Sequence, residues 1–370
     1  MSLISGFDSR EEATLMPSIP NDVAINILAR VPRLRHPILA SVSKPFRSLI
    51  DSQHLYSVRS LIGFVQPFLY ICIRVPSSPQ FLRWCTVHFT HDGTPKAVQL
   101  PPPPEFLVGS AYASIGAKIY VVGGSAEDVP SQKVICLDCL SRTWEAVPNM
   151  CVAREFAAAE VVDGKLYVIG GCVADSWTRS RNWAEVFDPV AGRWEPVDST
   201  NGEEEFVREK WMHASAEADG KIYAMADRNG VIYEPKTKRW CVVRGELDFG
   251  WRGRACAVGG ILYCYDFLGK IRGFDLGSGS GGWKKVKGVE GVLPRFLCGA
   301  TLTSLGNNLV AIWEAERGPV VEIWGAEIQL NNGGSNGSED EGFCGTVLWC
   351  GMILEAPIRS TILRSLAVIL

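Results

Sequence analysis

One pair of cysteines has the spacing of a metal-binding or redox motif. Cys136 and Cys139 stand three positions apart in the run Cys-Leu-Asp-Cys. A zinc finger needs a second such pair or paired histidines, and none follows at finger spacing. Side chains alternate between the two faces of a strand, so cysteines three positions apart point away from each other. We therefore expect no metal or redox site here.

The histidines give no stronger sign of catalysis. A pairing across the fold is left open, but a lone surface or core histidine is the simpler interpretation. The Gly-Gly doublets follow apolar runs and precede loops rather than helices, so we interpret them as turns and not as phosphate-binding loops. We predict no catalytic residue, no metal and no cofactor. The five histidines lie in separate segments, at His36, His54, His88, His91 and His213.

These residues lie in or beside a repeated pattern. Four times between residues 111 and 265, a small-residue apolar run is followed by a Gly-containing turn and a second apolar run with a tyrosine. A tryptophan follows each time in a later strand, roughly every 45 residues, which suits a unit of four strands. The anchors are Tyr120, Tyr167, Tyr223 and Tyr263, with Trp144, Trp194, Trp240 and Trp283.

The clearest copy covers residues 156–197. Its first apolar run ends at Asp163-Gly164, a pair typical of a two-residue hairpin turn because both positions need a positive φ. A second strand follows over 165–169, a third over 184–188 and a fourth over 193–197. One copy therefore predicts a four-stranded antiparallel sheet, which is one blade of a β-propeller.

Weaker copies on either side extend the series to six. A single sheet cannot bury both of its faces, so the blades must pack in a ring and the ring must close. We expect the terminal strand to complete the first blade, which has too few strands of its own. The predicted blades are about 60–100, 105–150, 151–200, 207–245, 252–290 and 295–330, followed by a flexible loop at 331–342 and by C-terminal strands at 343–370 that close the ring with the first blade.

The glycine doublets carry a family resemblance. Gly123-Gly124 and Gly170-Gly171 follow the second strand of their copies, as in the kelch family, and the chain resembles that family over roughly residues 60 to 370. The third and fourth copies depart from it, with Ala226-Asp227 and Asp266-Phe267 at the doublet. The resemblance implies a kelch-type propeller but no particular activity, because propellers host many.

Arginines and aromatic residues gather in the loops expected on one face of the ring. Such residues on rigidly held loops are typical of protein-binding hot spots. The excess of arginine suggests a partner with an acidic or phosphorylated segment; bracing of the loops is the structural alternative for each residue. The predicted substrate-binding residues are Arg154, Phe156, Trp177, Arg181, Trp211, His213, Trp251, Arg252, Arg254 and Arg295.

The segment before the repeats has helical spacing. After a flexible N-terminus at 1–14, we expect a helix carrying Val23 and Ile27 that ends at Pro32, and two further helices opening at Pro37 and Pro45. Three short helices within residues 15–58 form too small a core to cover their apolar stripes. A partner is therefore expected to cover them.

This helical segment resembles an F-box, the module that docks onto the Skp-type adaptor of cullin-RING ubiquitin ligases. The match lies in the Ile-Pro-x-Asp-Val opening, an Ile-Leu pair and a Val-Ser-Lys-x-aromatic-Arg run. Phe46 stands where the family usually has tryptophan, so the aromatic side chain is kept and the indole N–H is lost. The resemblance implies adaptor contacts by Ile19, Pro20, Val23, Ile27, Leu28, Val42 and Phe46.

The composition narrows the possible partners and the location. The net charge is −3, with 37 Lys+Arg against 40 Asp+Glu, which argues against a nucleic-acid partner. No basic region precedes an apolar stretch, and no run reaches the roughly 18 apolar residues of a membrane helix. The 12 cysteines lie mostly in apolar strands and indicate reduced thiols in the core. We expect a cytoplasmic or nuclear protein with no membrane partner.

The sequence therefore predicts a mainly β fold, a six-bladed kelch-type β-propeller preceded by a small three-helix F-box domain. The expected function is that of a non-catalytic substrate-recognition subunit, which joins a target protein to the Skp-type adaptor and through it to cullin and the RING protein. One alternative is a kelch scaffold that assembles no ligase. Another is a propeller enzyme of the copper-oxidase type, whose Tyr/His ligand set the sparse histidines do not favour.

Overall fold

A computed structural model describes most of the chain and divides it into two compact units. The first runs to Gln66 and includes Leu370, and the second covers Pro67–Ile369. The two segments predicted to be flexible, 1–14 and 331–342, lie outside the described residues except for their end positions. The structure describes residues 14–76, 81–90, 93–172, 182–198, 207, 210–212, 214–266, 268–277, 282–297, 299–331 and 342–370.

The first unit contains one helix more than the sequence predicted. The three expected helices are present, but Ser52 begins a fourth by accepting a hydrogen bond from the Leu55 amide at 3.4 Å. This helix buries little apolar surface, so its pattern was too weak to predict it, and it continues past the expected domain end at residue 58. The elements are α1 (Asn21–Ala29), a 3-10 turn η1 (Arg33–Arg35), α2 (His36–Val42), α3 (Lys44–Ile50) and α4 (Gln53–Leu61).

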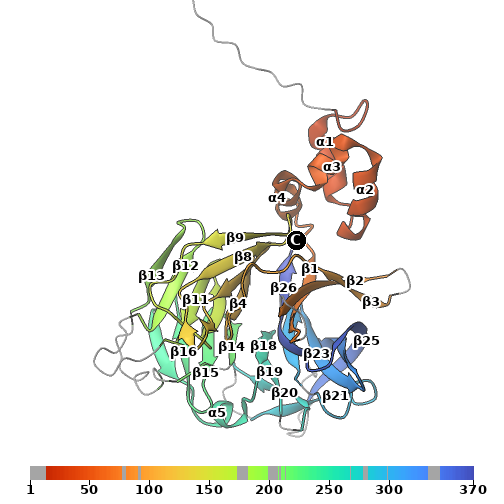
Figure 1. The fold of residues 1–370 in the computed structure, drawn as a ribbon. Helices are drawn as coiled ribbons and strands as arrows, with labels where there is room; N and C mark the ends of the chain where they lie inside the picture. Colours follow the sequence, from red (N-terminus) through yellow and green to blue (C-terminus); the bar gives the residue numbers. More distant parts are fainter. Residues whose placement is uncertain are drawn as a thin grey trace, which may run out of the picture. The chain divides into compact units, whose positions relative to one another are not determined.

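The second unit is built of antiparallel sheets in a propeller-like arrangement (Figure 1). Four sheets have four strands each. They comprise β26 (Thr361–Ile369), β1 (Pro67–Arg74), β2 (Leu82–Phe89) and β3 (Pro95–Gln99); β4 (Ala111–Ile115), β5 (Lys118–Val122), β8 (Val134–Asp138) and β9 (Thr143–Val147); β10 (Ala158–Val162), β11 (Lys165–Ile169), β12 (Ala184–Asp188) and β13 (Arg193–Pro196); and β14 (Ala214–Ala218), β15 (Lys221–Met225), β16 (Gly230–Glu234) and β17 (Arg239–Val242).

The remaining strands form one eight-stranded sheet and a small hairpin. Two antiparallel runs of four, β18–β21 and β22–β25, are joined by a short parallel pairing of β21 with β25. The short helix α5 (Glu246–Gly250) precedes the sheet, whose strands are β18 (Ala255–Val258), β19 (Ile261–Tyr265), β20 (Ile271–Asp275), β21 (Lys284–Lys287), β22 (Thr301–Leu305), β23 (Asn308–Arg317), β24 (Val320–Asn331) and β25 (Phe343–Pro357); the hairpin is β6 (Ser125–Ala126) with β7 (Val129–Pro130).

The predicted hairpin turn in the clearest repeat is confirmed. Val162 pairs with Lys165, which leaves Asp163 and Gly164 as the two turn residues. Their φ values of 49° and 73° are the left-handed values that this turn requires. The sequence pair therefore sets the register of β10 against β11.

A closed circuit of neighbouring edge strands runs through β26, β4, β10, β14, β18 and β22 and back to β26. The terminal strand β26 pairs antiparallel with β1 from Pro67 to Arg74, as the sequence predicted. The expectation that all strands after residue 343 join the first sheet is wrong, because β25 pairs with β24 instead. The two ends of this unit are therefore joined by hydrogen bonds of one sheet.

The repeated tryptophans connect each sheet to the one before it. The indole of Trp194 donates a hydrogen bond to the carbonyl of Pro148 at 2.7 Å, just beyond the preceding sheet. Trp144 and Trp240 donate in the same way to Pro101 at 2.9 Å and Asp198 at 3.0 Å. Trp283 donates to Glu246 at 2.9 Å. The recurring tryptophan is thus the residue that holds neighbouring sheets together.

Candidate functional site

The helical unit exposes pairs of large apolar side chains on two helices. Val23 and Ile27 are 45% and 46% exposed and lie one turn apart on α1. Ile38 and Val42 are 58% and 62% exposed and lie one turn apart on α2. Side chains four positions apart share a helix face, so each helix presents an apolar stripe to solvent.

Two of the predicted adaptor residues lie in the core of this unit instead. Leu28 is 2% exposed and Phe46 is 8% exposed. They belong to a single cluster, so in this structure they offer little surface for the expected contact with the adaptor. The cause is the helix period, since neighbours such as Ile27 and Leu28 are turned about 100° apart. The cluster contains Leu28, Ala29, Phe46, Leu49, Ile50 and Leu55.

The two remaining residues of the predicted set lie where α1 begins. Ile19 is partly buried and forms an isolated bridge with Met16. Pro20 is exposed and is the N-cap residue of α1. Ile19 and Pro20 therefore lead into the helix that carries the exposed Val23 and Ile27.

A buried arginine holds the end of α1 against α4. Arg59 is 0% exposed, and its Nη1 donates to the carbonyls of Ala29 and Val31 at 2.8 Å each. The Val31 carbonyl also accepts a hydrogen bond from Nε2 of His36 at 3.3 Å. Burial, with the nearby charges of Arg59 and Arg33, lowers the pKa of His36 to about 4. His36 is therefore neutral in the folded unit at neutral pH.

Acid is expected to destabilise the helical unit through His36. Its folded pKa lies below the unfolded value near 6.5, so the unfolded chain takes up the proton first as the pH falls. The free energy of unfolding that neutral His36 contributes is present in full above pH 6.5. It is lost between pH 6.5 and 4, and the loss is at most about 3 kcal/mol. Denaturant unfolding of the full chain across this window should show the loss. His36→Gln should flatten the pH dependence of the free energy of unfolding, whereas the exposed His54→Gln should not. If this free energy fell equally with pH in the wild type and both variants, His36 would not be the group responsible.

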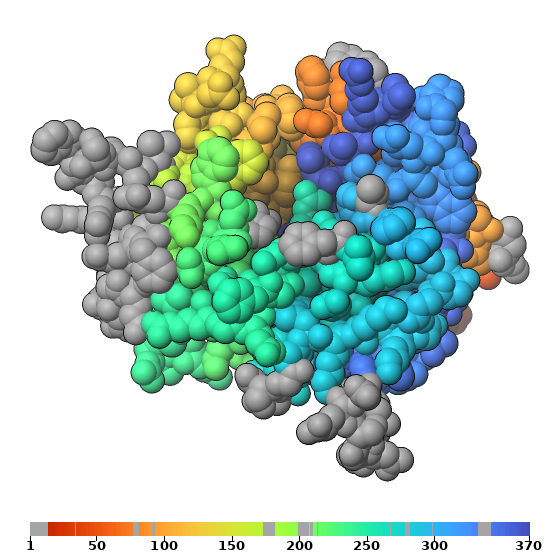
Figure 2. All heavy atoms as spheres, turned by 90° about the horizontal axis from the view of Figure 1, so that it is seen from below, coloured from red at the N-terminus to blue at the C-terminus, as the bar shows by residue number. Residues whose placement is uncertain are grey.

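The ring has a cavity of about 690 Å³ where the starting ends of several first strands meet. In Figure 1, α5, which precedes Gly253 and Arg254, lies at the lower end of the ring. Figure 2 views this lower face, which is hollowed near its middle. The lining is a mixture of charged, aromatic and small residues, among them Phe106, Tyr112, Phe156, Met212, Arg254, Tyr265, Glu314 and Arg364.

A second cavity of about 200 Å³ follows along the inner strands. Tyr112, Ala159 and Arg364 line both cavities, so they lie where the two approach each other. At this position Nη2 of Arg364 is 3.7 Å from Oε1 of Glu160. The same oxygen accepts a hydrogen bond from Ser215 at 2.6 Å, and burial raises the pKa of the Glu160 carboxyl.

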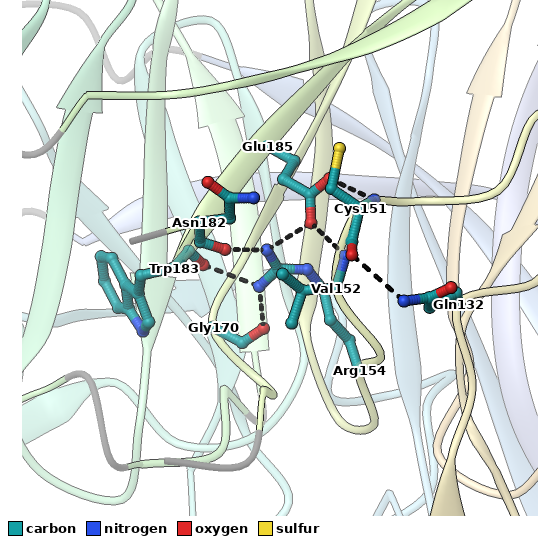
Figure 3. A network of polar contacts seen from close by, with 8 residues as sticks. All are labelled: Gln132, Cys151, Val152, Arg154, Gly170, Asn182, Trp183 and Glu185. Atoms are coloured by element: carbon teal, nitrogen blue, oxygen red, sulfur yellow. Dashed lines mark hydrogen bonds and ion pairs between the residues drawn. The ribbon is translucent and has the colours of Figure 1, made fainter. Parts of the chain in front are cut away.

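Arg154, predicted to contact a substrate, is a structural residue. It is 1% exposed, and its Nη2 lies 2.8 Å from Oε1 of Glu185, which is 0% exposed. Its Nη1 donates to the carbonyls of Gly170 and Trp183 at 2.8 and 2.7 Å, and Nη2 also donates to that of Asn182 (Figure 3). The arginine therefore joins the segment before β10 to the start of β12, and it has no surface to offer a partner.

Trp251 is also buried, against the prediction. It is 0% exposed and its indole donates to the Gly253 carbonyl at 3.1 Å. Arg252 donates to the carbonyls of Asp248 at 3.2 Å and Trp251 at 2.7 Å, which braces the turn after α5. Of the three residues predicted in this segment, Arg254 is the one that lines the large cavity, next to Gly253.

The exposed part of the predicted face is aromatic. Phe156 is 37% exposed and Trp211 is 61% exposed, and their ring centroids lie 4.9 Å apart. Arg295 is exposed, and its guanidinium lies 5.8 Å from the centroid of the Phe296 ring. Trp177, Arg181 and His213 lie outside the described residues.

The described residues offer binding groups and no metal-ligand set. Among them, no group of three His, Cys, Asp or Glu side chains is placed to hold a metal ion. Cys136 and Cys139 are buried, and burial raises the pKa of Cys136 to about 11, so its thiol is protonated. In the same part of the chain, no helix has the length and apolar character to cross a membrane.

Two cavity residues were absent from the predicted site, Arg364, which lines both cavities, and Glu160, which lines the smaller one. Each lies in a first strand, where small and apolar residues were expected to be buried between sheets. A charged residue inside such a strand is itself a signal, because an unpaired charge there would be costly. Arg364, the one charged residue of the terminal strand, could have been recognised in this way.

Comparisons with known proteins agree with this two-unit organisation. Residues 16–58 match the family model of the F-box domain, and residues 84–354 match that of the FKB95 kelch-repeats domain. One F-box/kelch-repeat protein of Arabidopsis thaliana is 36% identical, over 82% of this chain and 81% of its own length. Another from the same plant is 33% identical, over 93% of this chain and 88% of its own.

Solved structures give a more distant likeness. The structure of YjhT aligns with 68% of this chain and 89% of its own, at 15% identity and a TM-score of 0.48.

Proposed function

The chain belongs to the F-box/kelch-repeat family, and we therefore propose that it is the substrate-recognition subunit of a cullin-RING ubiquitin ligase. The helical unit would bind a Skp-type adaptor, and the adaptor would connect it to cullin and the RING protein. The ring would hold a target protein. This assignment places the protein in the cytoplasm or nucleus, where such ligases would meet their targets.

The exposed apolar stripes of the helical unit are the observation that carries the proposal. The unit buries Leu28 and Phe46 in its own core, yet Val23 and Ile27 on α1 remain about half exposed. A small folded unit that leaves such side chains in water is typical of a docking module. Because Phe46 supports the core from within, the missing indole would affect folding of the unit more than contact with the adaptor.

We propose that the ring has six blades, with the two four-stranded runs of the eight-stranded sheet taken as one blade each. Six inner strands in a closed circuit support this count. For target contact we propose the adjacent, exposed Phe156 and Trp211, because large aromatic side chains dominate protein-binding hot spots. Arg295 would add a charge for an acidic or phosphorylated segment of the target.

The protein itself would break no bond. The chain would hold a target beside a conjugating enzyme that carries ubiquitin, which raises the effective concentration of the target's lysines. This would be its whole contribution to the rate of ubiquitin transfer. A kelch scaffold that assembles no ligase is the alternative.

Self-modification separates the two functions without knowledge of the target. The full chain is incubated with adaptor, cullin, RING protein, conjugating enzymes, ubiquitin and ATP. With no target bound, we expect ubiquitin on the chain's own lysines, because these are then held nearest to the conjugating enzyme. When the adaptor is omitted, the chain should no longer be modified with ubiquitin. A chain that binds the adaptor but is never modified would argue against the receptor role, and one that binds no adaptor would support the scaffold.

A further inference from the structure

We propose that the 690 Å³ cavity of the ring binds a small organic acid, with its carboxylate on Arg254 and Arg364 and its apolar body against Phe106, Met212 and Tyr265. This site goes beyond the adaptor and target contacts proposed above and uses no residue of the helical unit. The volume falls within the range of about 300–1,000 Å³ typical of small-molecule sites.

The lining is positively charged. Among the described residues that line the cavity, Arg74, Arg254 and Arg364 are cationic and Glu314 is anionic. Burial and the like charge of Arg364 lower the pKa of Arg254. Two guanidinium groups that repel each other in a recess favour an anion between them.

Both arginines retain donors that could serve a ligand. Nη1 of Arg254 donates to the carbonyl of Ile362 at 3.1 Å, the one hydrogen bond that the described residues give this guanidinium. Arg364 approaches Glu160 only at 3.7 Å, and its buried Nε has no partner in the described part of the chain. Planar guanidinium groups bind carboxylates through two parallel N–H donors, so these N–H groups suit a carboxylate.

A bulge in the terminal strand fixes Arg254 in place. The register between β1 and β26 shifts after Cys72, so Ile362 pairs with Ile73 and Leu363 is the extra residue. The Ile362 amide donates to Oε1 of Glu314 at 2.6 Å, while its carbonyl accepts from Arg254. Bulges often aim side chains into sites. The carboxylate of Glu314 is thereby hydrogen-bonded to the backbone. Arg254 and Arg364 therefore remain available to bind an anion.

The position of Arg364 favours a small molecule over a protein segment. Arg364 lines both cavities and so lies at the inner end of the larger one. A free acid can enter whole, whereas a segment of a folded partner would have to carry its main chain into the ring. Phe106, Leu107 and Met212 give the walls an apolar character that suits an aliphatic or aromatic body rather than a bare phosphate.

Benzoate is the probe for this site, and benzamide is its neutral counterpart of similar shape. Benzoate is titrated into the full chain, and binding is measured by calorimetry and by ligand-observed NMR. We expect saturable binding with a Kd of about 1 mM or tighter. Arg364→Met and Arg254→Lys should each weaken it about 10-fold or more, and Arg193→Met, on an exposed outer strand, should not. Ala157→Leu, which narrows the cavity without changing its charge, should weaken it similarly.

Several results would overturn the proposal. They are no saturation by benzoate, equal binding of benzamide, or benzoate affinity unchanged in folded Ala157→Leu and Arg254→Lys proteins. Arginine-dependent binding of a poly-glutamate peptide in place of benzoate would also overturn it. Adaptor binding should be the same in all four variants, so failure of the cavity proposal is distinct from failure of the receptor function.

Discussion

Ile27→Asp is expected to reduce adaptor binding by at least about 100-fold while the chain stays as stable as the wild type. Ile27 is 46% exposed on α1 and contributes little to the core of the helical unit. In the docked complex its side chain would be covered, and a carboxylate buried there without a partner costs several kcal/mol. Capture of a Skp-type adaptor by the immobilised full chain, at graded adaptor concentrations, measures the loss.

Two comparison variants make this result specific. Val190→Asp places the same charge at a 97% exposed position on the ring and should leave adaptor binding unchanged. Leu28→Asp changes a 2% exposed core residue and should lose binding together with helical content, seen by circular dichroism. If Ile27→Asp and Val42→Asp both bound the adaptor as the wild type does, the exposed stripes would not be the docking surface.

Arg154→Met is expected to lower the free energy of unfolding of the ring by about 3–5 kcal/mol. The change leaves Glu185 buried without its cation and removes the donors to three backbone carbonyls, those of Gly170, Asn182 and Trp183. In the described part of the chain, Glu185 would keep the amides of Cys151 and Val152, which donate at 2.7 and 3.1 Å. Denaturant unfolding followed by tryptophan fluorescence measures the effect.

Arg193→Met is the matched control for this prediction. Its partner Glu195 is 2.8 Å away, but both side chains are more than half exposed, so the pair is worth about 1 kcal/mol or less. The double variant Arg154→Met/Glu185→Gln should lose less than the two single losses added together, because no buried charge is left unpaired. A loss under about 1 kcal/mol for Arg154→Met would show that the pair does not hold the segment before β10 against β12.

The arrangement of the ring follows from sequence because its signals are local. The pair Asp163-Gly164 lies between two apolar runs, and the hairpin follows from the positive φ that both positions adopt. Three of the recurring tryptophans, Trp144, Trp194 and Trp240, lie in the last strand of a sheet, and Trp283 lies directly before β21. Closure by β26 was predictable for a different reason, since the first sheet lacked a strand and the last strand lacked a neighbour.

Burial of the charged and aromatic loop residues could not be predicted in the same way. Arg154 and Arg254 both precede a first strand by a few residues, yet one is paired inside the ring and the other lines a cavity. The difference lies in their partners, Glu185 and Ile362, which are distant in sequence. Repeats predict where a loop begins, but the neighbouring sheet decides which side chain it covers.

The helical unit shows the same limit on a smaller scale. Ile27 and Leu28 form one motif in the sequence, yet the first is half exposed and the second is in the core. Helix geometry demands that adjacent residues face different directions, but only the packed neighbours decide which of the two turns inward. The fourth helix was missed because it buries mainly Leu55 and the polar Arg59.

Calorimetric titration of the full chain against a Skp-type adaptor is the most direct test of the receptor function. We expect saturable one-to-one binding with a Kd of about 1 μM or tighter, through the exposed stripes on α1 and α2. Absence of binding between two proteins that are both folded would contradict it, because the helical unit would then have no partner for the apolar side chains it exposes.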